Sequence, residues 1–390
     1  MLHKKSYLTS RALGGIANSL FSMVFIWWLQ ISTKSSFVVG ISEAIFSMTA
    51  AFSIFYGPII DKSSFKKISI YSMIVQTTFL FILTGSVYYL SQNYKVAIVL
   101  AGIISICDEF FNPADRAILK ETVTSTGELN SLISRVSVID QFVNIAGTIL
   151  SGILLTILIS GQVLLICCCL SLASVAILIY SLNNVKNNKA YSQKHAKKYW
   201  KQIFNGYKFI KNNKFLRHYF WSSILYSFVT PALTILLPRI AQSLGSAALY
   251  STFYICFVLG FVVGAYVSRK LKVEVKLIGI TWTLSSIPLL LMLFFYKNWF
   301  IFCFLILLFG LSTSIHNILS ETMIQIKTND SILGRVLTTI RTSTSLGGPI
   351  GSLGAGLLLD NSNELVLVII CFILVFFSGI NILIARNDKM

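Results

Sequence analysis

The chain has 390 residues, of which 55% are hydrophobic and only 12% are charged, and its mean hydropathy is +0.77. A soluble domain carries about 25% charged residues, so this composition excludes an ordinary soluble protein and indicates one embedded in lipid. Lys and Arg number 32 against 14 Asp and Glu. Because cytoplasmic loops of membrane proteins collect basic residues, we attribute the excess to loop topology and expect no nucleic-acid partner.

Twelve segments are long and apolar enough to cross a bilayer, which takes about 20 mostly apolar residues. Six precede a long polar break, at 8–31, 37–59, 67–91, 95–114, 131–158 and 162–183. Six follow it, at 215–240, 247–268, 276–296, 299–325, 332–358 and 364–385. The sequence therefore predicts an all-α membrane protein with twelve transmembrane helices in two six-helix bundles. We expect the first segment to be a permanent helix, because no Ala-x-Ala cleavage site follows it.

The basic residues predict the orientation of these helices. With both termini inside the cell, all 32 Lys and Arg lie in inner segments except Lys34, Lys95, Arg239 and Lys297. Removing one span would invert every later loop and destroy this asymmetry. We therefore expect a multi-pass protein of the cell membrane with both termini in the cytoplasm.

The polar break divides the chain into an N-terminal bundle (1–185), a cytoplasmic basic linker (186–214) and a C-terminal bundle (215–390). In the linker, apolar residues recur at helical spacing between lysines, at Trp200, Ile203, Phe204, Tyr207 and Ile210. This pattern favours a helix lying on the anionic inner leaflet, and a disordered basic linker is the alternative.

Ionisable groups at membrane depth are costly and usually functional. The candidates are Glu43, Asp108, Glu109, Asp140, Glu321 and Arg341. We hypothesise that one or two of the carboxylates bind and release protons, since burial disfavours the charged form. Asp140 and Glu43 are the first choices, because both lie deep in a span with no basic residue one turn away on the same helix. The alternative for each is a structural hydrogen bond between helices.

Two of these groups have a second interpretation as structural partners. Glu321 and Arg341 are placed to pair across the tenth and eleventh spans. An inner-face network is also expected, formed by Asp108, Glu109, Asp115, Arg116 and Arg135.

Aromatic side chains are the candidates for the lining of a substrate cavity, namely Phe25, Trp27, Trp28, Phe228 and Trp282. Packing between helices is the alternative role for each of them. His316 is expected to be a hydrogen-bonded residue of the bundle. The seven cysteines lie in apolar stretches without a CxxC pair or neighbouring His, so we interpret them as packing residues and expect neither a metal site nor a cofactor.

Two Gly-containing stretches carry motifs. The loop after the second span reads Gly57-Pro58-Ile59-Ile60-Asp61-Lys62-Ser63-Ser64-Phe65-Lys66-Lys67. Gly57 permits close helix approach, Asp61 can bind the N-terminus of a neighbouring helix, and Lys62, Lys66 and Lys67 face the inner leaflet. The eleventh span contains Gly347, Gly348, Pro349 and Gly351, which predict a helix able to bend.

The first of these stretches resembles motif A of the major facilitator superfamily, a Gly-x-x-x-Asp-Arg-x-Gly-Arg-Arg pattern, with Ser64 in place of its second Gly. The corresponding second-half loop, Gly264 to Lys270, has Ser268 at the acidic position. The stretches 110–119 and 317–336 are similar to the macrolide-efflux and siderophore-export branch. The resemblance implies the major facilitator fold and a drug:proton antiporter, although the fifth span has no Gly-Pro pair of the antiporter type.

The leading interpretation is a proton-coupled exporter of an amphipathic small molecule that works by alternating access, as a monomer in the bilayer. The rivals are an uptake permease or an uncoupled facilitator and, more remotely, a membrane sensor or scaffold. An enzyme is not expected, because the four His are scattered and no catalytic cluster is visible. No phosphate-binding loop occurs, which excludes direct use of ATP by such a loop.

Overall fold

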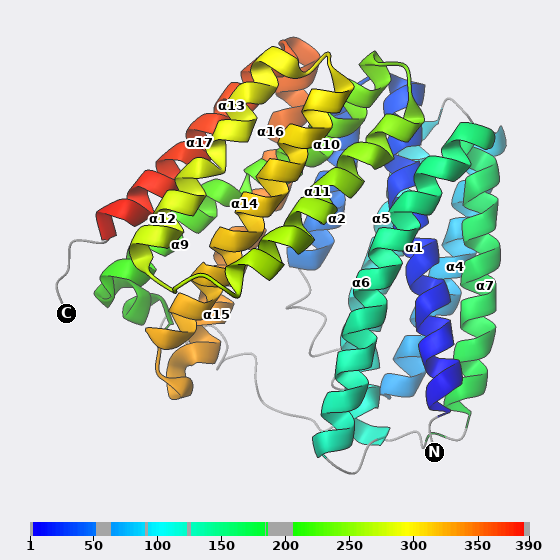
Figure 1. Cartoon of the computed structure of the whole chain (residues 1–390). Helices are drawn as coiled ribbons and strands as arrows, with labels where there is room; N and C mark the ends of the chain where they lie inside the picture. Colours follow the sequence, from blue (N-terminus) through cyan, green and yellow to red (C-terminus); the bar gives the residue numbers. More distant parts are fainter. Residues whose placement is uncertain are drawn as a thin grey trace. The chain divides into compact units, whose positions relative to one another are not determined.

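The computed structural model describes residues 3–51, 64–89, 93–122, 126–183, 185 and 206–385, and these residues are almost wholly helical (Figure 1). The chain divides into two compact units. The first unit is Met1–Lys34 with Thr49–Gln193, and the second is Ser35–Met48 with Lys194–Met390. Residues Ser35–Met48 thus come from the first half of the sequence but group with the second.

The first unit is built on α1, which packs against both α6 and α7, while α4 packs against α5 and α7 (Figure 1). The helices are α1 (Lys4–Thr33), α4 (Phe65–Tyr89), α5 (Tyr94–Thr122), α6 (Thr126–Ile157) and α7 (Ser160–Leu182). Small polar residues join α1 to α7: the Ser10 hydroxyl donates to the Ser174 carbonyl at 2.8 Å, and the Ser174 hydroxyl donates to the Ser10 carbonyl at 2.7 Å. Such reciprocal bonds satisfy polar groups that lipid cannot.

The second unit pairs α11 with α14, α12 and α9 with α17, and α10 with α16. Its helices are α9 (Lys214–Ser227), α10 (Val229–Ser243), α11 (Ala247–Ser268), α12 (Val275–Leu284), α13 (Ser286–Phe295), α14 (Trp299–Ile326), α15 (Asp330–Ser345), α16 (Gly347–Asn361) and α17 (Glu364–Ile384), together with most of α2 (Ser36–Ala51). Glycines set the α11–α14 distance, because a Cβ at Gly260 or Gly310 would lie within 2.3 Å of a carbonyl oxygen of the other helix.

Ten of the predicted spans are present among the described residues as helices long and apolar enough to cross a membrane. The second predicted span begins as α2, and its later part lies outside the described residues. The eleventh is divided into α15 and α16. Many large apolar side chains on these helices are exposed, which is the pattern expected when the surface faces lipid rather than water.

Three spans of the second unit are interrupted, and each interruption follows from a proline. Pro231, Pro288 and Pro349 lack a backbone N–H, and their rings clash with the carbonyl four residues earlier. The residues four positions before them are Ser227, Leu284 and Ser345, which are the last residues of α9, α12 and α15. Pro113 and Pro238 lie inside undivided helices, so a proline is not sufficient by itself.

Most of the predicted basic linker lies outside the described residues, and only its last turns are described. Residues 206–212 are helical, and a Cβ at Gly206 would meet the carbonyl oxygen of Arg335 at 2.6 Å. Ile210 is buried, while the half-exposed Tyr207 packs edge-on against Phe220. This part of the predicted surface helix is therefore packed against α15 and α9.

Candidate functional site

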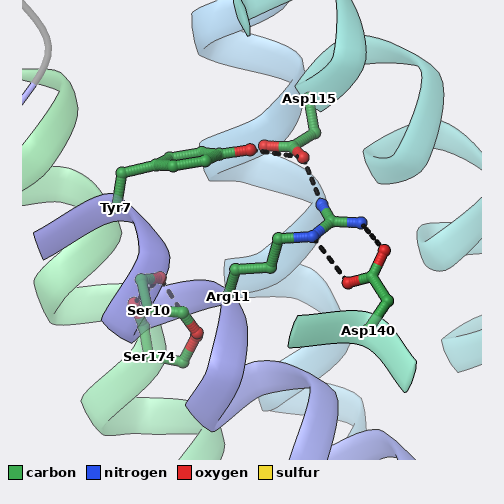
Figure 2. Close-up of polar contacts among 6 residues, drawn as sticks. All are labelled: Tyr7, Ser10, Arg11, Asp115, Asp140 and Ser174. Atoms are coloured by element: carbon green, nitrogen blue, oxygen red, sulfur yellow. Dashed lines mark hydrogen bonds and ion pairs between the residues drawn. The ribbon is translucent and has the colours of Figure 1, made fainter. Parts of the chain in front are cut away.

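A charged cluster joins three helices of the first unit (Figure 2). Arg11 on α1 donates from Nε and Nη2 to the two carboxylate oxygens of Asp140 on α6, each at 2.8 Å. Its Nη1 contacts Asp115 on α5. One turn before Arg11, the Tyr7 hydroxyl donates to the same Asp115 oxygen at 2.7 Å. The guanidinium is thus shared between two carboxylates, one of them bound in the bidentate geometry that favours Arg.

The two carboxylates of this cluster differ in burial. The Asp115 side chain is 1% exposed and that of Arg11 is 11% exposed, whereas Asp140 is 40% exposed. Removing the cation of a buried pair typically costs about 3–5 kcal/mol, so Arg11 holds the three helices together electrostatically.

The cluster changes the meaning of two sequence predictions. Asp140 was expected to be a deep carboxylate with no basic residue one turn away on its own helix, and its basic partner, Arg11, comes from α1. Asp115 was expected in a network with Arg116 and Arg135, and it contacts Arg11 and Tyr7. Arg135 is exposed, and the side chain of Arg116 lies outside the described part of the chain.

A second polar cluster lies two helical turns further along α1. Asn18 Nδ2 on α1 and Gln76 Nε2 on α4 both donate to Oδ1 of Asp108 on α5, each at 3.0 Å. Gln76 Nε2 also donates to Asn18 Oδ1 at 2.9 Å. Asp108 is partly buried, and no basic residue contacts it in the described part of the chain. Two neutral amides thus orient a carboxylate whose charge is not balanced locally.

Glu43 lies on α2 in the segment that groups with the second unit. Its side chain is partly buried and close enough to Tyr250 and Tyr254 of α11 to interact electrostatically. Within the described residues it makes no hydrogen bond and no ion pair. An isolated carboxylate in an apolar setting favours its protonated form.

The N-terminus of α2 is bound by Asp360 at the end of α16. The Asp360 carboxylate accepts from the Ser36 N–H at 2.7 Å and the Phe37 N–H at 3.2 Å, and it contacts the Ser35 hydroxyl. A negative charge at this position satisfies free N–H groups and complements the helix dipole. Sequence reasoning missed Asp360, although it continues a four-residue spacing of small residues on α16.

That spacing places Gly348, Ser352 and Gly356 against α2. A Cβ at Gly356 would meet the Ser36 carbonyl oxygen at 2.7 Å, and a Cβ at Gly40 of α2 would meet the Ser352 carbonyl oxygen at 2.6 Å. The two backbones therefore touch along this face. The predicted role of Gly347, Gly348, Pro349 and Gly351 in bending stays a prediction, since the structure shows only that α15 ends just before them.

The structure describes some of the remaining predicted site residues. Glu321 and Arg341 are both exposed and do not pair with each other, and Glu109 is partly buried beside Asp108. Gly57, Asp61 and Lys62 lie outside the described residues, whereas Lys66 and Lys67 lie at the start of α4. The Lys66 ammonium donates to the carbonyls of Asn183 and Val185, each at 3.1 Å.

Four of the five aromatic candidates are buried, and the fifth, Phe228 at the junction of α9 and α10, is partly buried. Phe25, Trp27 and Trp28 are almost fully buried, and Phe25 stacks between Phe21 and Trp28. Trp282 is 1% exposed. Their role as a cavity lining stays a prediction.

His316 differs from expectation. The buried ring stacks on Trp282 with centroids 4.5 Å apart and meets the edge of Tyr226. Neither imidazole nitrogen has a hydrogen-bond partner among the described residues. The expectation of a hydrogen-bonded histidine is therefore wrong, because its neighbours on α9 and α12 present aromatic rings.

Comparison with known proteins supports the fold. A sequence model of the Major Facilitator Superfamily matches residues 8–281 and 232–389, and no curated protein matches the chain. A bacterial homologue of the iron transporter ferroportin, solved in an inward-facing state, has a TM-score of 0.77 at 13% identity, covering 99% of this chain and 98% of that one. The nucleoside transporter NupG has a TM-score of 0.72 at 12% identity, with both chains fully covered.

At such low identity these structures establish the fold alone, and the predicted all-α fold is confirmed. The family match and the ten apolar helices together identify a multi-pass membrane protein. Transport rather than catalysis is the activity of this family, so the expectation that the chain is not an enzyme is confirmed. The chain therefore belongs to the Major Facilitator Superfamily and is a membrane transporter.

Proposed function

We propose that this transporter exports an amphipathic small molecule, such as a drug, a macrolide or a siderophore-like metabolite, by alternating access coupled to proton entry. In this proposal it works as a monomer in the cell membrane with both termini in the cytoplasm. The observation that carries the proton coupling is Glu43, a carboxylate in the short apolar helix α2 that has no hydrogen bond or ion pair with a described residue.

Glu43 is suited to coupling because its surroundings depend on where α2 lies. While α2 is bound by Asp360 and packed on α16, Glu43 faces the two tyrosines of α11. In that position the neutral acid is favoured. Separation of α2 from α16 and α11 would expose the carboxyl group to water, where it ionises and releases its proton. Proton binding and the position of α2 are then linked, which is the requirement for coupling.

Asp140 plays a different part in this scheme. Unlike Glu43, it forms a bidentate pair with a guanidinium, that of Arg11. We propose that the cluster of Tyr7, Arg11, Asp115 and Asp140 has a structural role and holds α1, α5 and α6 together. We also propose that the motif A residues Asp61 and Lys62, which lie outside the described residues, act as a latch that holds the two halves in one state.

The test uses inside-out vesicles and a panel of macrolides, cationic dyes and siderophores, with nucleosides and Fe²⁺ added because of the fold relatives. We expect an acidic vesicle interior to drive accumulation of at least one compound and an uncoupler to abolish it. Glu43→Gln should lose gradient-driven accumulation but keep downhill exchange. Full gradient coupling in both Glu43→Gln and Asp140→Asn would remove the proposal.

The alternatives give different results in the same vesicles. An uptake permease would move its substrate out of the inside-out vesicles. An uncoupled facilitator would equilibrate substrate at the same rate with and without the uncoupler.

A further inference from the structure

Helices α1 and α5 of the first unit present two matched pairs of polar residues. Arg11 contacts Asp115, and Asn18 contacts Asp108. The two positions are seven residues apart on both helices, and they run in opposite directions along the chain. Seven residues are close to two helical turns, or about 10.5 Å along the axis. The pairs therefore link the antiparallel helices α1 and α5 at two levels. We call the Arg11–Asp115 pair the first rung and the Asn18–Asp108 pair the second rung.

The rungs differ in charge. In the first, a guanidinium neutralises the carboxylate and is shared with Asp140. In the second, the residue of α1 is a neutral amide, and Gln76 adds another amide rather than a cation. Glu109 interacts electrostatically with Asp108 and adds to the negative potential there. A carboxylate of this kind at membrane depth is expensive unless a positive group reaches it.

The hydrogen bonds also indicate which kind of positive group fits. Both amides donate to Oδ1 of Asp108, and Oδ2 makes no hydrogen bond with a described residue. The Asn18 side-chain oxygen already accepts a hydrogen bond from the Gln76 amide, which makes it a poor metal ligand. A sodium ion or a divalent cation needs about six oxygen ligands, which these residues do not offer. An ammonium group needs only one or two acceptors.

We propose that Asp108, held by Asn18 and Gln76, binds the protonated amine of the transported molecule. The ligand supplies to the second rung the cation that Arg11 supplies to the first. The inference rests on the proposed function only in taking the ligand to be the cargo, and it narrows that cargo to amphipathic amines. Asp108 is partly exposed, so an amine can reach Oδ2 without unfolding of the bundle.

The test is equilibrium binding to the purified full chain in lipid nanodiscs, with dansylcadaverine as the probe and its N-acetyl derivative as the uncharged partner. Binding needs neither a gradient nor a transport direction. The binding result can therefore be interpreted even if the proposal of proton-coupled export is wrong. We expect the amine to bind roughly tenfold more tightly than the acetylated probe. Loss of one member of a desolvated charge pair typically weakens binding by at least this factor.

Two substitutions should remove this preference, and the first of them leaves the shape of the site nearly unchanged. Asp108→Asn keeps an oxygen for both amide donors but removes the charge. Asn18→Arg supplies an internal cation and copies the first rung. Glu274→Gln, which removes an exposed carboxylate at the start of α12, is the control and should keep the preference. Thermal unfolding of each variant identifies any that fail to fold, and Asp108→Asn is the variant expected to fold normally.

Any of three results would overturn the proposal. The first is the absence of a preference for the amine in the wild-type chain, including absence of binding. The second is an unchanged preference in folded Asp108→Asn. The third is displacement of the amine by NaCl but not by choline chloride, which would make the site one for a metal cation.

Discussion

The contact between α2 and α16 can be tested with two alanine substitutions on one helix. Gly356 and Gly354 both lie in α16, two residues apart. A Cβ at Gly356 would lie 2.7 Å from the Ser36 carbonyl oxygen and 2.8 Å from the Phe37 Cα. A Cβ at Gly354 would meet no atom within 4 Å. Gly354→Ala is therefore a matched control for Gly356→Ala.

The expected magnitudes follow from two opposing effects. Alanine is favoured over glycine inside a helix by about 1 kcal/mol, and both variants gain this term. Only Gly356→Ala must push two backbones apart, because both atoms that it meets belong to the main chain. Overpacking of this kind costs about 1–3 kcal/mol. We expect Gly354→Ala to be as stable as the wild type or more stable, and Gly356→Ala to be less stable than Gly354→Ala by about 1–3 kcal/mol.

The assay is thermal unfolding of the purified proteins in one detergent, followed by transport in vesicles. For domains of 150–250 residues, 1 kcal/mol corresponds to about 2–4 °C in Tm, so the two variants should differ by several degrees. An equal or higher Tm for Gly356→Ala than for Gly354→Ala would show that the backbones of α2 and α16 do not touch, and the reasoning about α2 would fail with it.

Three further predictions use the same unfolding measurement. Arg11→Ala should destabilise the chain by about 3–5 kcal/mol, because the carboxylates of Asp115 and Asp140 both lose a cationic partner. Asp140→Asn should cost much less, because its carboxylate is 40% exposed. Equal losses of stability in the two variants would contradict the shared-cation arrangement. Asp360→Ala should lower the stability by about 1–2 kcal/mol, because α2 loses its N-terminal cap. Glu364→Ala should cost less, because the 3.4 Å ion pair between Glu364 and Arg239 is partly exposed. A larger loss for Glu364→Ala than for Asp360→Ala would count against capping of α2. His316→Phe should be neutral or stabilising, since neither ring nitrogen is bonded to a described residue; a clear loss of stability would reveal a bonding partner.

The sequence was sufficient to predict ten of the spans and their order, because lipid allows only closed helical backbones and each span must be apolar. It was also sufficient to find the ionisable groups that lie within the apolar segments. It was not sufficient to predict their partners. Arg11 and Asp140 are separated by 129 residues, and their meeting depends on which helices are neighbours and how each is rotated.

Two other features show where sequence reasoning stops. The binding of α2 by Asp360 places a segment of the first half with the second, and hydropathy carries no information about that choice. The interruptions before Pro231 and Pro288 were visible as prolines, yet Pro113 and Pro238 lie in undivided helices. Local chemistry permits an interruption, and tertiary packing decides whether it occurs.

The interrupted spans give the two units different mechanical properties. In the second unit, three spans each have one point where the backbone hydrogen-bond ladder is incomplete. Serine hydroxyls beside these points donate to carbonyls of the preceding turn. Ser227 donates to the Ile224 carbonyl at 2.6 Å, and Ser345 donates to the Thr342 carbonyl at 2.8 Å. The described helices of the first unit are continuous. Among the described helices, these points at which a span can bend all lie in the second unit, so we expect elastic deformation during the transport cycle to concentrate there.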